Sequence, residues 1–337
     1  MFTDNLRIGW NLGNSLDSYE EELGMNNEPK AYETAWHNPV TTKAMIQKVI
    51  NSGFDIIRIP VTWYQNIGPA PEYKINPKWM ARVKEVVDWA YEEGVYVIIN
   101  THHEDWVDPY YANNEATKEK LAAVWKQIAT TFADYNEKLI FEGINEPRKR
   151  NTSLEWGGGD KEGWDVLNQW SQTFVDAVRS TGGNNQTRQL MVTGYAASST
   201  ELALSHIEVP KDDNVIVSVH AYEPWEFCLN LKGRREWEHD TYNVDTMMKN
   251  LKQYFIDKGI PVILGEFGAM DRNHNVEERA AWAEYYVREA KKLGIPCIWW
   301  DNNEFTGDGE TLGLFNRKTM EIEYPEVLNA LMKGLEL

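Results

Sequence analysis

Short apolar runs alternate along the whole chain with longer segments in which apolar residues recur at helical spacing. The short runs are apolar almost throughout, which is typical of parallel strands that are covered on both faces. We therefore expect eight strands, at residues 7–12, 56–61, 96–101, 139–144, 189–194, 215–221, 261–267 and 297–302.

The segments between these runs are predicted to be helices. Residues 77–93 form the clearest one, because Asn76 can cap it and Pro77 suits its first turn. Its apolar face consists of Trp79, Val83, Val86, Val87 and Ala90. Further helices are expected at 41–52, 115–134, 162–181, 243–258, 277–292 and 325–335. The connection at 195–214 has room for a helix of only one or two turns.

Four helix-to-strand junctions carry a glycine, namely Gly53, Gly94, Gly259 and Gly294. Glycine after a helix readily takes the left-handed conformation that ends it. Eight β/α units without a linker predict an α/β fold, a (β/α)8 barrel that forms a single domain over residues 1–337. A doubly wound open sheet is the alternative. It needs a glycine-rich phosphate turn, however, and residues 9–14 have the wrong spacing and no helix directly after them.

The chain is acidic, with a net charge of −18 and a pI near 4.9. This charge argues against nucleic acid or an anionic membrane as a partner and suits a neutral substrate. No apolar run approaches the roughly 18–20 residues of a membrane span. The first residues lack the basic and apolar regions of a signal peptide, as a mature secreted domain also would, so they leave the compartment open. Cys228 and Cys297 are expected to be free thiols.

In a barrel of this kind, the carboxyl ends of the strands and the loops after them form the active face. Polar and aromatic residues gather at the predicted strand ends. They are Asn14, Asp17, Arg58, Trp63, His102, His103, Asn145, Glu146, His220, Tyr222, Glu266, Trp300, Asp301 and Asn302. This concentration predicts a polar, aromatic-lined site at one end of the barrel.

Two of these residues, Glu146 and Glu266, end apolar strands that lie 120 positions apart. Glycoside hydrolysis needs one protonated carboxyl for the leaving oxygen and one ionised carboxylate for the oxocarbenium-like carbon. Arg58 would hold a neighbouring glutamate ionised, while tryptophan stacks on a sugar ring and Asn, His and Asp side chains bond its hydroxyls. A metal site at His102 and His103 is the alternative, but the residues that follow them have no helical ligand spacing.

Seven motifs in this order resemble glycoside hydrolase family 5 of clan A, and within it the endo-β-1,4-glucanases and xyloglucanases of subfamily 4. They are GWNLGNSLD at 9–17, ETAWHNP at 33–39, RIPVTW at 58–63, THH at 101–103, GINEP at 143–147, SVHAY at 218–222 and GEFG at 265–268. The resemblance spans essentially the whole chain. It implies a (β/α)8 barrel that cleaves a β-1,4-glucan with retention and uses neither a cofactor nor a metal.

The same resemblance implies roles for the strand-end residues. Glu266 would attack the anomeric carbon, with Arg58 and Tyr222 orienting it and keeping it ionised. Glu146 would protonate the leaving sugar and then deprotonate water, supported by His220. The carboxyl groups of the two glutamates are then expected to lie about 5–5.5 Å apart.

The resemblance also implies a set of sugar-binding residues. Asn145 would bond the 2-hydroxyl beside the cleaved bond. The sugar before the cleavage point would contact Asn14, His102, His103 and Trp300, with Trp36 stacking further out. Asp17, Asn302 and Trp225 complete the predicted sugar-binding set. A cis peptide is expected at Trp300–Asp301.

Two positions depart from the pattern of the family. His37 stands where glycine is usual, and Asn303 ends the motif after the eighth strand where glycine is commoner. Both changes are expected to reshape the glycone end of the groove without altering the chemistry.

Three loops rich in aromatic residues, at 18–40, 148–164 and 223–242, favour an open groove for a polymer. Candidate sugar platforms on them are Trp156, Trp164, Trp225 and Trp237. We expect a secreted, monomeric endo-β-1,4-glucanase that binds a polysaccharide. A mannan- or xylan-active relative is the nearest alternative, and a non-catalytic carbohydrate-binding barrel is an alternative of another class.

Overall fold

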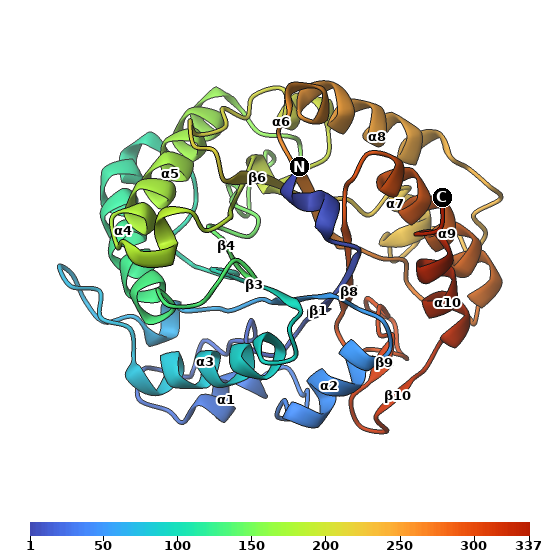
Figure 1. Cartoon of the computed structure of the whole chain (residues 1–337), viewed down its shortest axis with the longest axis horizontal. Coiled ribbons are helices and arrows are strands. Elements are labelled where there is room, and N and C mark those ends of the chain that lie inside the picture. The colour runs from blue at the N-terminus through green and yellow to red at the C-terminus, as the bar shows by residue number, and fades with distance from the viewer.

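The computed structural model describes all 337 residues, and its eight central strands close into a parallel barrel in the order β1 to β8 (Figure 1). The strands are β1 (Ile8–Leu12), β2 (Ile56–Ile59), β3 (Tyr96–Asn100), β4 (Leu139–Glu142), β5 (Leu190–Thr193), β6 (Val215–His220), β7 (Val262–Phe267) and β8 (Cys297–Asp301). Each one falls within its predicted range. The predicted (β/α)8 barrel is confirmed.

Helices form a ring outside the strands, as Figure 1 shows. The long ones are α2 (Lys43–Asn51), α3 (Pro77–Tyr91), α4 (Asn114–Thr131), α5 (Lys161–Arg179), α8 (Tyr242–Tyr254), α9 (Val276–Lys292) and α10 (Pro325–Lys333). Short helices occur at α1 (Pro29–Glu33), α6 (Glu201–Leu204) and α7 (Trp225–Cys228), and β9 (Phe315–Asn316) pairs with β10 (Glu321–Ile322). The single turn of α6 confirms the short fifth connection. None of the helices has both the length and the apolar character that crossing a membrane requires.

The predicted end signals of α3 are present in the structure. The Asn76 side chain accepts a hydrogen bond from the backbone N–H of Lys78 at 3.0 Å, and Pro77 begins the helix. The predicted apolar face is buried against the barrel. The cap therefore fixes where this helix begins, and the buried apolar residues fix which face packs against the barrel.

The lower barrel interior is filled by one apolar layer. Seven strands each contribute one side chain, and Leu6 joins them from below; the layer consists of Leu6, Ile56, Ile98, Ile140, Met191, Ile216, Ile263 and Ile298. On β1 the corresponding residue is Gly9, where an added Cβ would lie 2.9 Å from both Ile298 and Ile56. Only glycine fits there. Because side chains alternate along a strand, residues two positions further on form the next interior layer, and several of these are polar.

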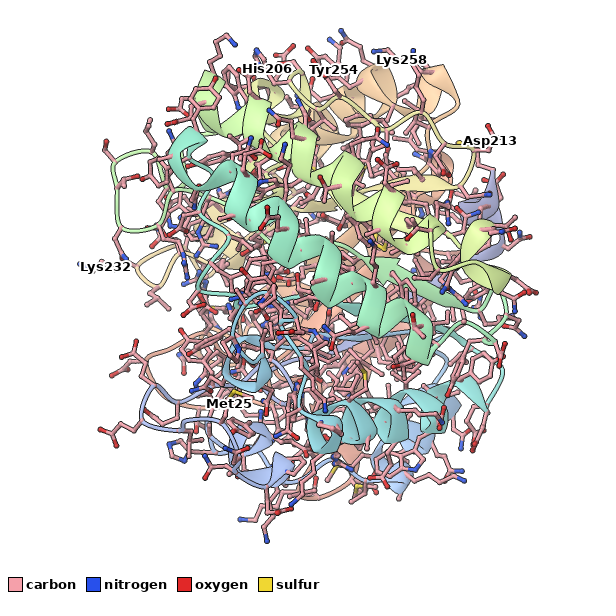
Figure 2. The ribbon with its side chains drawn as sticks, turned by 90° about the vertical axis from the view of Figure 1, so that its left-hand side faces the viewer. Met25, His206, Asp213, Lys232, Tyr254 and Lys258 are labelled. Atoms are coloured by element: carbon pink, nitrogen blue, oxygen red, sulfur yellow. The ribbon has the colours of Figure 1, made fainter.

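The loops that follow the strands project from the opposite end of the barrel. Figure 2 shows the loop after β1, which carries Met25, and the loop after β6, which carries Lys232, on the same side of the molecule. Helices α4 and α5 lie side by side on the outside. The barrel thus presents its loops, and the strand ends beneath them, at one face.

The two departures from the family pattern both lie at left-handed positions, with φ of 71° at His37 and 61° at Asn303. This conformation costs a non-glycine residue about 1–2 kcal/mol. His37 is exposed, and its side chain makes no hydrogen bond in the structure. Glycine relieves this strain but also adds conformational entropy to the unfolded chain, which cancels part of the gain. We therefore expect His37→Gly to raise the free energy of unfolding, measured by urea titration, by about 0.5–1 kcal/mol.

Asn303→Gly is the matched comparison, because Asn303 uses its side chain. Its Nδ2 donates to Asn38 Oδ1 at 3.1 Å, and its Oδ1 accepts from the backbone N–H of Arg317 at 3.0 Å. Loss of these bonds offsets the relief of strain, so no gain in stability is expected. Equal stabilisation by both changes would contradict this explanation.

Candidate active site

Arg58 on β2 occupies the centre of the polar interior layer and is fully buried. Its Nη1 donates to Glu266 Oε1 and to Asn11 Oδ1, both at 2.9 Å. Its Nη2 donates to Glu142 Oε1 at 2.5 Å and to Asn145 Oδ1 at 2.8 Å. Burial acts to lower the pKa of Arg58, but the two carboxylates raise it further above its usual range. Arg58 is therefore a fixed cation that joins β1, β4 and β7.

Glu142 on β4 is a central residue that the sequence analysis missed. It is fully buried and accepts hydrogen bonds from Arg58, from Asn100 Nδ2 at 3.0 Å and from Ser218 Oγ at 3.2 Å. Burial acts to raise its pKa, but the Arg58 charge and hydrogen bond leave that pKa below its ordinary value. The signal for it was strand alternation, because Glu142 lies two positions after the interior residue Ile140.

Glu142→Gln is expected to destabilise the fold by about 2–3 kcal/mol, because Arg58 keeps only one of its two carboxylate partners. The undivided Arg58 charge would then stabilise ionised Glu266, so the acid limb of the kcat/KM profile should move to lower pH. Urea unfolding and the pH dependence of kcat/KM measure the two effects. Ser218→Ala, which removes a neutral bond to Glu142, is the control and should move neither substantially.

Glu146 and Glu266 lie close together at the ends of β4 and β7. His220 Nδ1 is 2.7 Å from Glu146 Oε2 and 3.7 Å from Glu266 Oε1, and a carboxylate oxygen of each glutamate lies within 4.8 Å of the other. Tyr222 donates its hydroxyl to Glu266 Oε2 at 2.8 Å. The short oxygen-to-oxygen distance agrees with the separation of about 5–5.5 Å between carboxyl groups in retaining enzymes, whereas inverting enzymes have about 6.5–9.5 Å.

The environment gives the two carboxyl groups different pKa values. Burial raises the pKa of Glu266 above its ordinary value, and the opposing effects of His220, Arg58 and Tyr222 do not cancel it. Burial acts on Glu146 in the same direction, but the hydrogen bond and charge of His220 bring its pKa below its ordinary value. The carboxylates in turn outweigh burial and raise the pKa of His220. This order is the reverse of the one that the predicted roles need, because the predicted acid Glu146 has the lowered pKa and the predicted nucleophile Glu266 the raised one. A bound sugar therefore has to draw a proton from His220 to Glu146 along their 2.7 Å contact before Glu146 can act as an acid.

A wall of aromatic rings adjoins the two carboxyl groups. The His102 and Trp300 rings are nearly parallel, with centroids 5.8 Å apart, and His103 contacts Trp36 at 5.4 Å. Tyr19 packs edge-on against Trp36 at 5.2 Å. Burial lowers the pKa of His103 to about 4 and that of His102 well below its usual range, so both rings are neutral at neutral pH. Neutral imidazoles beside indole faces suit an uncharged sugar.

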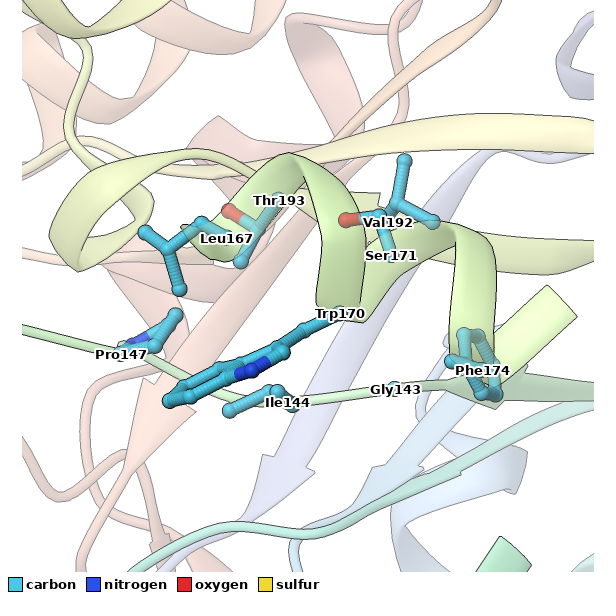
Figure 3. Close-up of a pocket in the computed structure, with 9 residues that line it drawn as sticks. All are labelled: Gly143, Ile144, Pro147, Leu167, Trp170, Ser171, Phe174, Val192 and Thr193. Atoms are coloured by element: carbon cyan, nitrogen blue, oxygen red, sulfur yellow. The ribbon is translucent and has the colours of Figure 1, made fainter. Parts of the chain in front are cut away.

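A polar groove of about 160 Å³ runs along this wall to Glu146, and its lining includes Tyr19, Tyr64, His102, His103, Glu146 and Arg148. A second cavity, shown in Figure 3, lies between the Gly143–Pro147 loop and α5. Its volume of about 10 Å³ is at most enough for one water molecule. Of these two cavities, only the groove is large enough to hold a sugar.

Three of the predicted sugar-binding residues lie in loops at the edge of this wall. Asn14 is half-buried, and its backbone carbonyl accepts from Asn38 Nδ2 at 2.9 Å. Asp17 is fully buried and accepts from the backbone N–H groups of Asn14 and Ser15. Asn302 donates to the Glu310 carbonyl at 2.6 Å and is also buried. Asp17 and Asn302 thus hold the backbone of these loops, and their contact with a sugar stays a prediction.

The four candidate platforms differ in exposure. Trp237 is only 1% exposed and donates to the Asp240 carbonyl, so its prediction as a platform was wrong and it belongs to the core. Trp164 stacks on His206 with ring centroids 3.5 Å apart. Trp225 is 50% exposed at the start of α7, and Trp156 is 61% exposed. Exposed Trp225 and Trp156 remain available to a ligand.

The predicted cis peptide at Trp300–Asp301 was also wrong, since the cis bonds of the chain precede Pro71 and Pro224. Asp301 instead continues the ladder between β8 and β1, opposite Leu12. Its carboxylate accepts from Trp10 Nε1 and from the backbone N–H of Phe315, both at 2.8 Å. These bonds hold Asp301 in extended conformation.

Two clusters have the side chains of a metal site, namely Asp17 with His102 and His103, and Glu146 with His220 and Glu266. In the first, Asp17 already accepts two backbone hydrogen bonds. In the second, the hydrogen bonds of His220, Arg58 and Tyr222 occupy the carboxylates. Both clusters are accounted for by contacts within the chain, and the expectation of no metal stays a prediction.

A parallel (β/α)8 barrel with two close carboxyl groups at the ends of β4 and β7, beside an aromatic groove, is typical of glycoside hydrolases. The family model described as Cellulase (glycosyl hydrolase family 5) matches residues 16–306. The chain belongs to glycosyl hydrolase family 5 and is an endo-β-1,4-glucanase, as the seven motifs indicated.

Named relatives agree with this assignment. Endoglucanase B of Neocallimastix patriciarum is 48% identical over 334 residues, which are 98% of this chain and 70% of the relative. A solved broad-specificity endoglucanase of subfamily 4 from Clostridium longisporum has a TM-score of 0.96 at 43% identity, covering 99% of this chain and 97% of that one. A similar enzyme from Ruminococcus champanellensis, solved with bound cellotriose, has a TM-score of 0.96 at 45% identity over 98% and 97% of the two chains.

Proposed function

We propose that this endoglucanase cleaves internal β-1,4-glucosidic bonds of soluble glucans by double displacement, with Glu266 as nucleophile and Glu146 as acid and base. The close placement of these two carboxyl groups, bridged by His220, is the observation that carries the proposal. The bound cellotriose of the R. champanellensis enzyme supports a glucan chain as the ligand class.

The first step forms a bond between a Glu266 oxygen and the anomeric carbon while the glycosidic bond breaks. Glu146 gives its proton to the departing oxygen and is left as a carboxylate, and the sugar becomes an ester of Glu266. In the second step Glu146 takes a proton from water, the resulting hydroxide equivalent attacks the anomeric carbon, and Glu266 leaves as a carboxylate. Two inversions at one carbon give net retention.

The neighbouring side chains have distinct tasks in these steps. Arg58 and Tyr222 each hold one oxygen of Glu266, which fixes the carboxylate beneath the anomeric carbon. Asn145 Oδ1 accepts from Arg58 Nη2, which leaves the Asn145 Nδ2 group to donate to the 2-hydroxyl of the sugar. His102, His103, Trp300 and Trp36 form the wall for the glycone sugars.

Reducing-sugar release from carboxymethyl cellulose, mixed-linkage glucan, xyloglucan, glucomannan and xylan tests the proposal. Activity on the glucans that disappears in Glu266→Gln would support it, and a rapid fall in viscosity for each reducing end would identify internal cleavage. Preference for glucomannan or xylan would favour a mannan- or xylan-active enzyme. Binding without cleavage of any polymer would favour a carbohydrate-binding barrel.

Because a polysaccharide is too large to enter a cell, we further propose that the protein acts outside it. We also propose that it acts as a monomer, since each barrel contains both carboxyl groups and the groove. Light scattering of the purified chain, with and without a soluble glucan, measures the oligomeric state. A stable dimer would contradict this part of the proposal.

A further inference from the structure

Arg148 places a second cation at the site, outside the network of Arg58. Its Nη1 lies 4.0 Å from Glu146 Oε1, the carboxylate oxygen that His220 does not contact. The Arg148 and Glu146 side chains are each 19% exposed, so the contact is only partly open to water. A positive charge at this distance favours the ionised form of a carboxyl group.

The Arg148 guanidinium is fixed by three contacts on its own loop. Its Nη1 donates to the backbone carbonyl of Glu146 at 2.9 Å, and its Nε donates to Glu155 Oε1 at 3.1 Å. Its Cζ lies 4.0 Å from the ring centroid of Trp156, which is a close cation–π distance. Trp156 itself is 61% exposed. A mobile surface arginine would not be held on so many sides.

This loop borders the groove along the aromatic wall, because Arg148 lines it together with Tyr19, His102 and His103. It follows β4 and rests on the start of α6, since a Cβ on Gly158 would lie 3.2 Å from both Leu202 and Thr200. The rings of Trp36 and Trp300 instead belong to the segments around β1 and β8, across the barrel. Arg148 therefore lies at the end of this groove beside Glu146, with Trp156 against its guanidinium.

We propose that Arg148 is a positioning residue that strengthens Glu146 as the acid for glucosyl leaving groups, and that Trp156 shields this contact from water. This inference rests on the proposed function of Glu146. As the proton moves to the glycosidic oxygen, Glu146 gains negative charge, and Arg148 stabilises that charge where it develops. A glucan chain in the groove excludes further water and strengthens the effect.

Other charged and titratable groups also face Glu146. They are His220 on β6, Tyr222 after β6, Glu266 on β7, His103 after β3 and Glu310 in the loop after β8. His220 acts with Arg148 to lower the pKa of Glu146, His103 is neutral, and Glu266 and Glu310 are acidic. Removing Arg148 leaves all of these in place, so its own effect can be measured as a difference.

The test compares Arg148→Met, Arg148→Lys and wild type on cellotetraose and on dinitrophenyl cellobioside over a range of pH. At a pH where Glu146 is protonated, Arg148→Met should lower kcat on cellotetraose about threefold, with KM nearly unchanged, because a weaker acid transfers its proton less readily. The basic limb of kcat/KM should move up by about one pH unit, since the Glu146 carboxyl loses a cation that favours its ionised form. Arg148→Lys keeps the positive charge, so its kcat and the pH of its basic limb should lie between those of Arg148→Met and the wild type. Dinitrophenyl cellobioside needs no protonation, so its cleavage should be nearly unaffected.

Arg150→Met is the matched control, because Arg150 lies on the same loop and pairs with Asp108 at 2.6 Å instead of with Glu146. Arg150→Met should leave the basic limb of the kcat/KM profile at the same pH as in the wild type. An unmoved limb in Arg148→Met, or an equal shift in Arg150→Met, would overturn the inference. If Arg148→Met fails to fold, Trp156→Leu decides, since uncovering the contact should give a smaller shift in the same direction. A wild type that hydrolyses no glucan would overturn the proposed function instead.

Discussion

Glu266→Gln is expected to reduce the hydrolysis of every glucan substrate on the order of 10⁴-fold or more, with the fold intact. Glutamine has nearly the shape of glutamate and can keep the contacts with Arg58 and Tyr222. A neutral amide, however, cannot form the glycosyl ester through which double displacement proceeds. Initial rates on mixed-linkage glucan, with thermal unfolding as the control for folding, measure the loss.

The smaller variant Glu266→Ala distinguishes a nucleophile from a residue that only supports the site. It opens a space below the anomeric carbon, and added azide can then attack from that side. With dinitrophenyl cellobioside the new carbon–nitrogen bond replaces the bond to dinitrophenolate, which leaves with its electron pair, and the product is the α-azide. A β-azide would mean that the two glutamates have exchanged roles, and substantial residual hydrolysis would refute the assignment.

Strand ends and helix faces were predictable from the sequence because both are local properties. The apolar runs located every strand within its predicted range, and the period of α3 identified its buried face. Parallel strands in one barrel must end at the same face, so Arg58, Glu146 and Glu266 could be grouped before any distance was known. The barrel topology was therefore enough to predict that these residues, far apart in the sequence, lie close together.

Residues in long loops were not predictable in the same way. Trp237 occurs in a polar loop, yet the fold buries it against the side chains around Tyr285, with ring centroids 5.7 Å apart. Asp17 and Asn302 have side chains suited to sugars but use them on backbone groups of their own loops. Which partner such a side chain finds depends on how distant segments pack, and no local pattern carries that information.

Glu142 was missed for a different reason. The alternation of side chains along β4 places it in the barrel interior, but only the strand ends were considered as site residues. Attention to strand ends selects the residues that meet solvent, whereas the charge balance of the site is set one layer below them. Arg58 needs a buried counterion in that layer, and strand alternation from Ile140 identifies Glu142 as the acidic residue able to supply it. Interior polar residues of barrel strands can therefore be predicted by following each strand inward from its end.

Glu146→Ala is expected to lower the hydrolysis of polymers by about 10³–10⁴-fold while sparing the first step on dinitrophenyl cellobioside. The alkoxide of a departing glucose is a poor leaving group and needs the proton of Glu146, but dinitrophenolate leaves without help. The glycosyl-enzyme then forms quickly and breaks down slowly, because no base activates water. A rapid burst of dinitrophenolate followed by a slow steady rate, with a lowered KM, is the expected signature.

Azide distinguishes the role of Glu146 as acid in the first step from its role as base in the second. In Glu146→Ala it needs no general base, so it should speed the breakdown of the glycosyl-enzyme and yield the β-azide through a second inversion. That product is opposite in configuration to the one expected from Glu266→Ala, and the pair of outcomes assigns both carboxyl groups independently. His220, which contacts both glutamates, would remain in place in either variant and keep the site otherwise comparable. If dinitrophenyl cellobioside and the polymers lost activity equally in Glu146→Ala, without a burst, Glu146 would not be the acid.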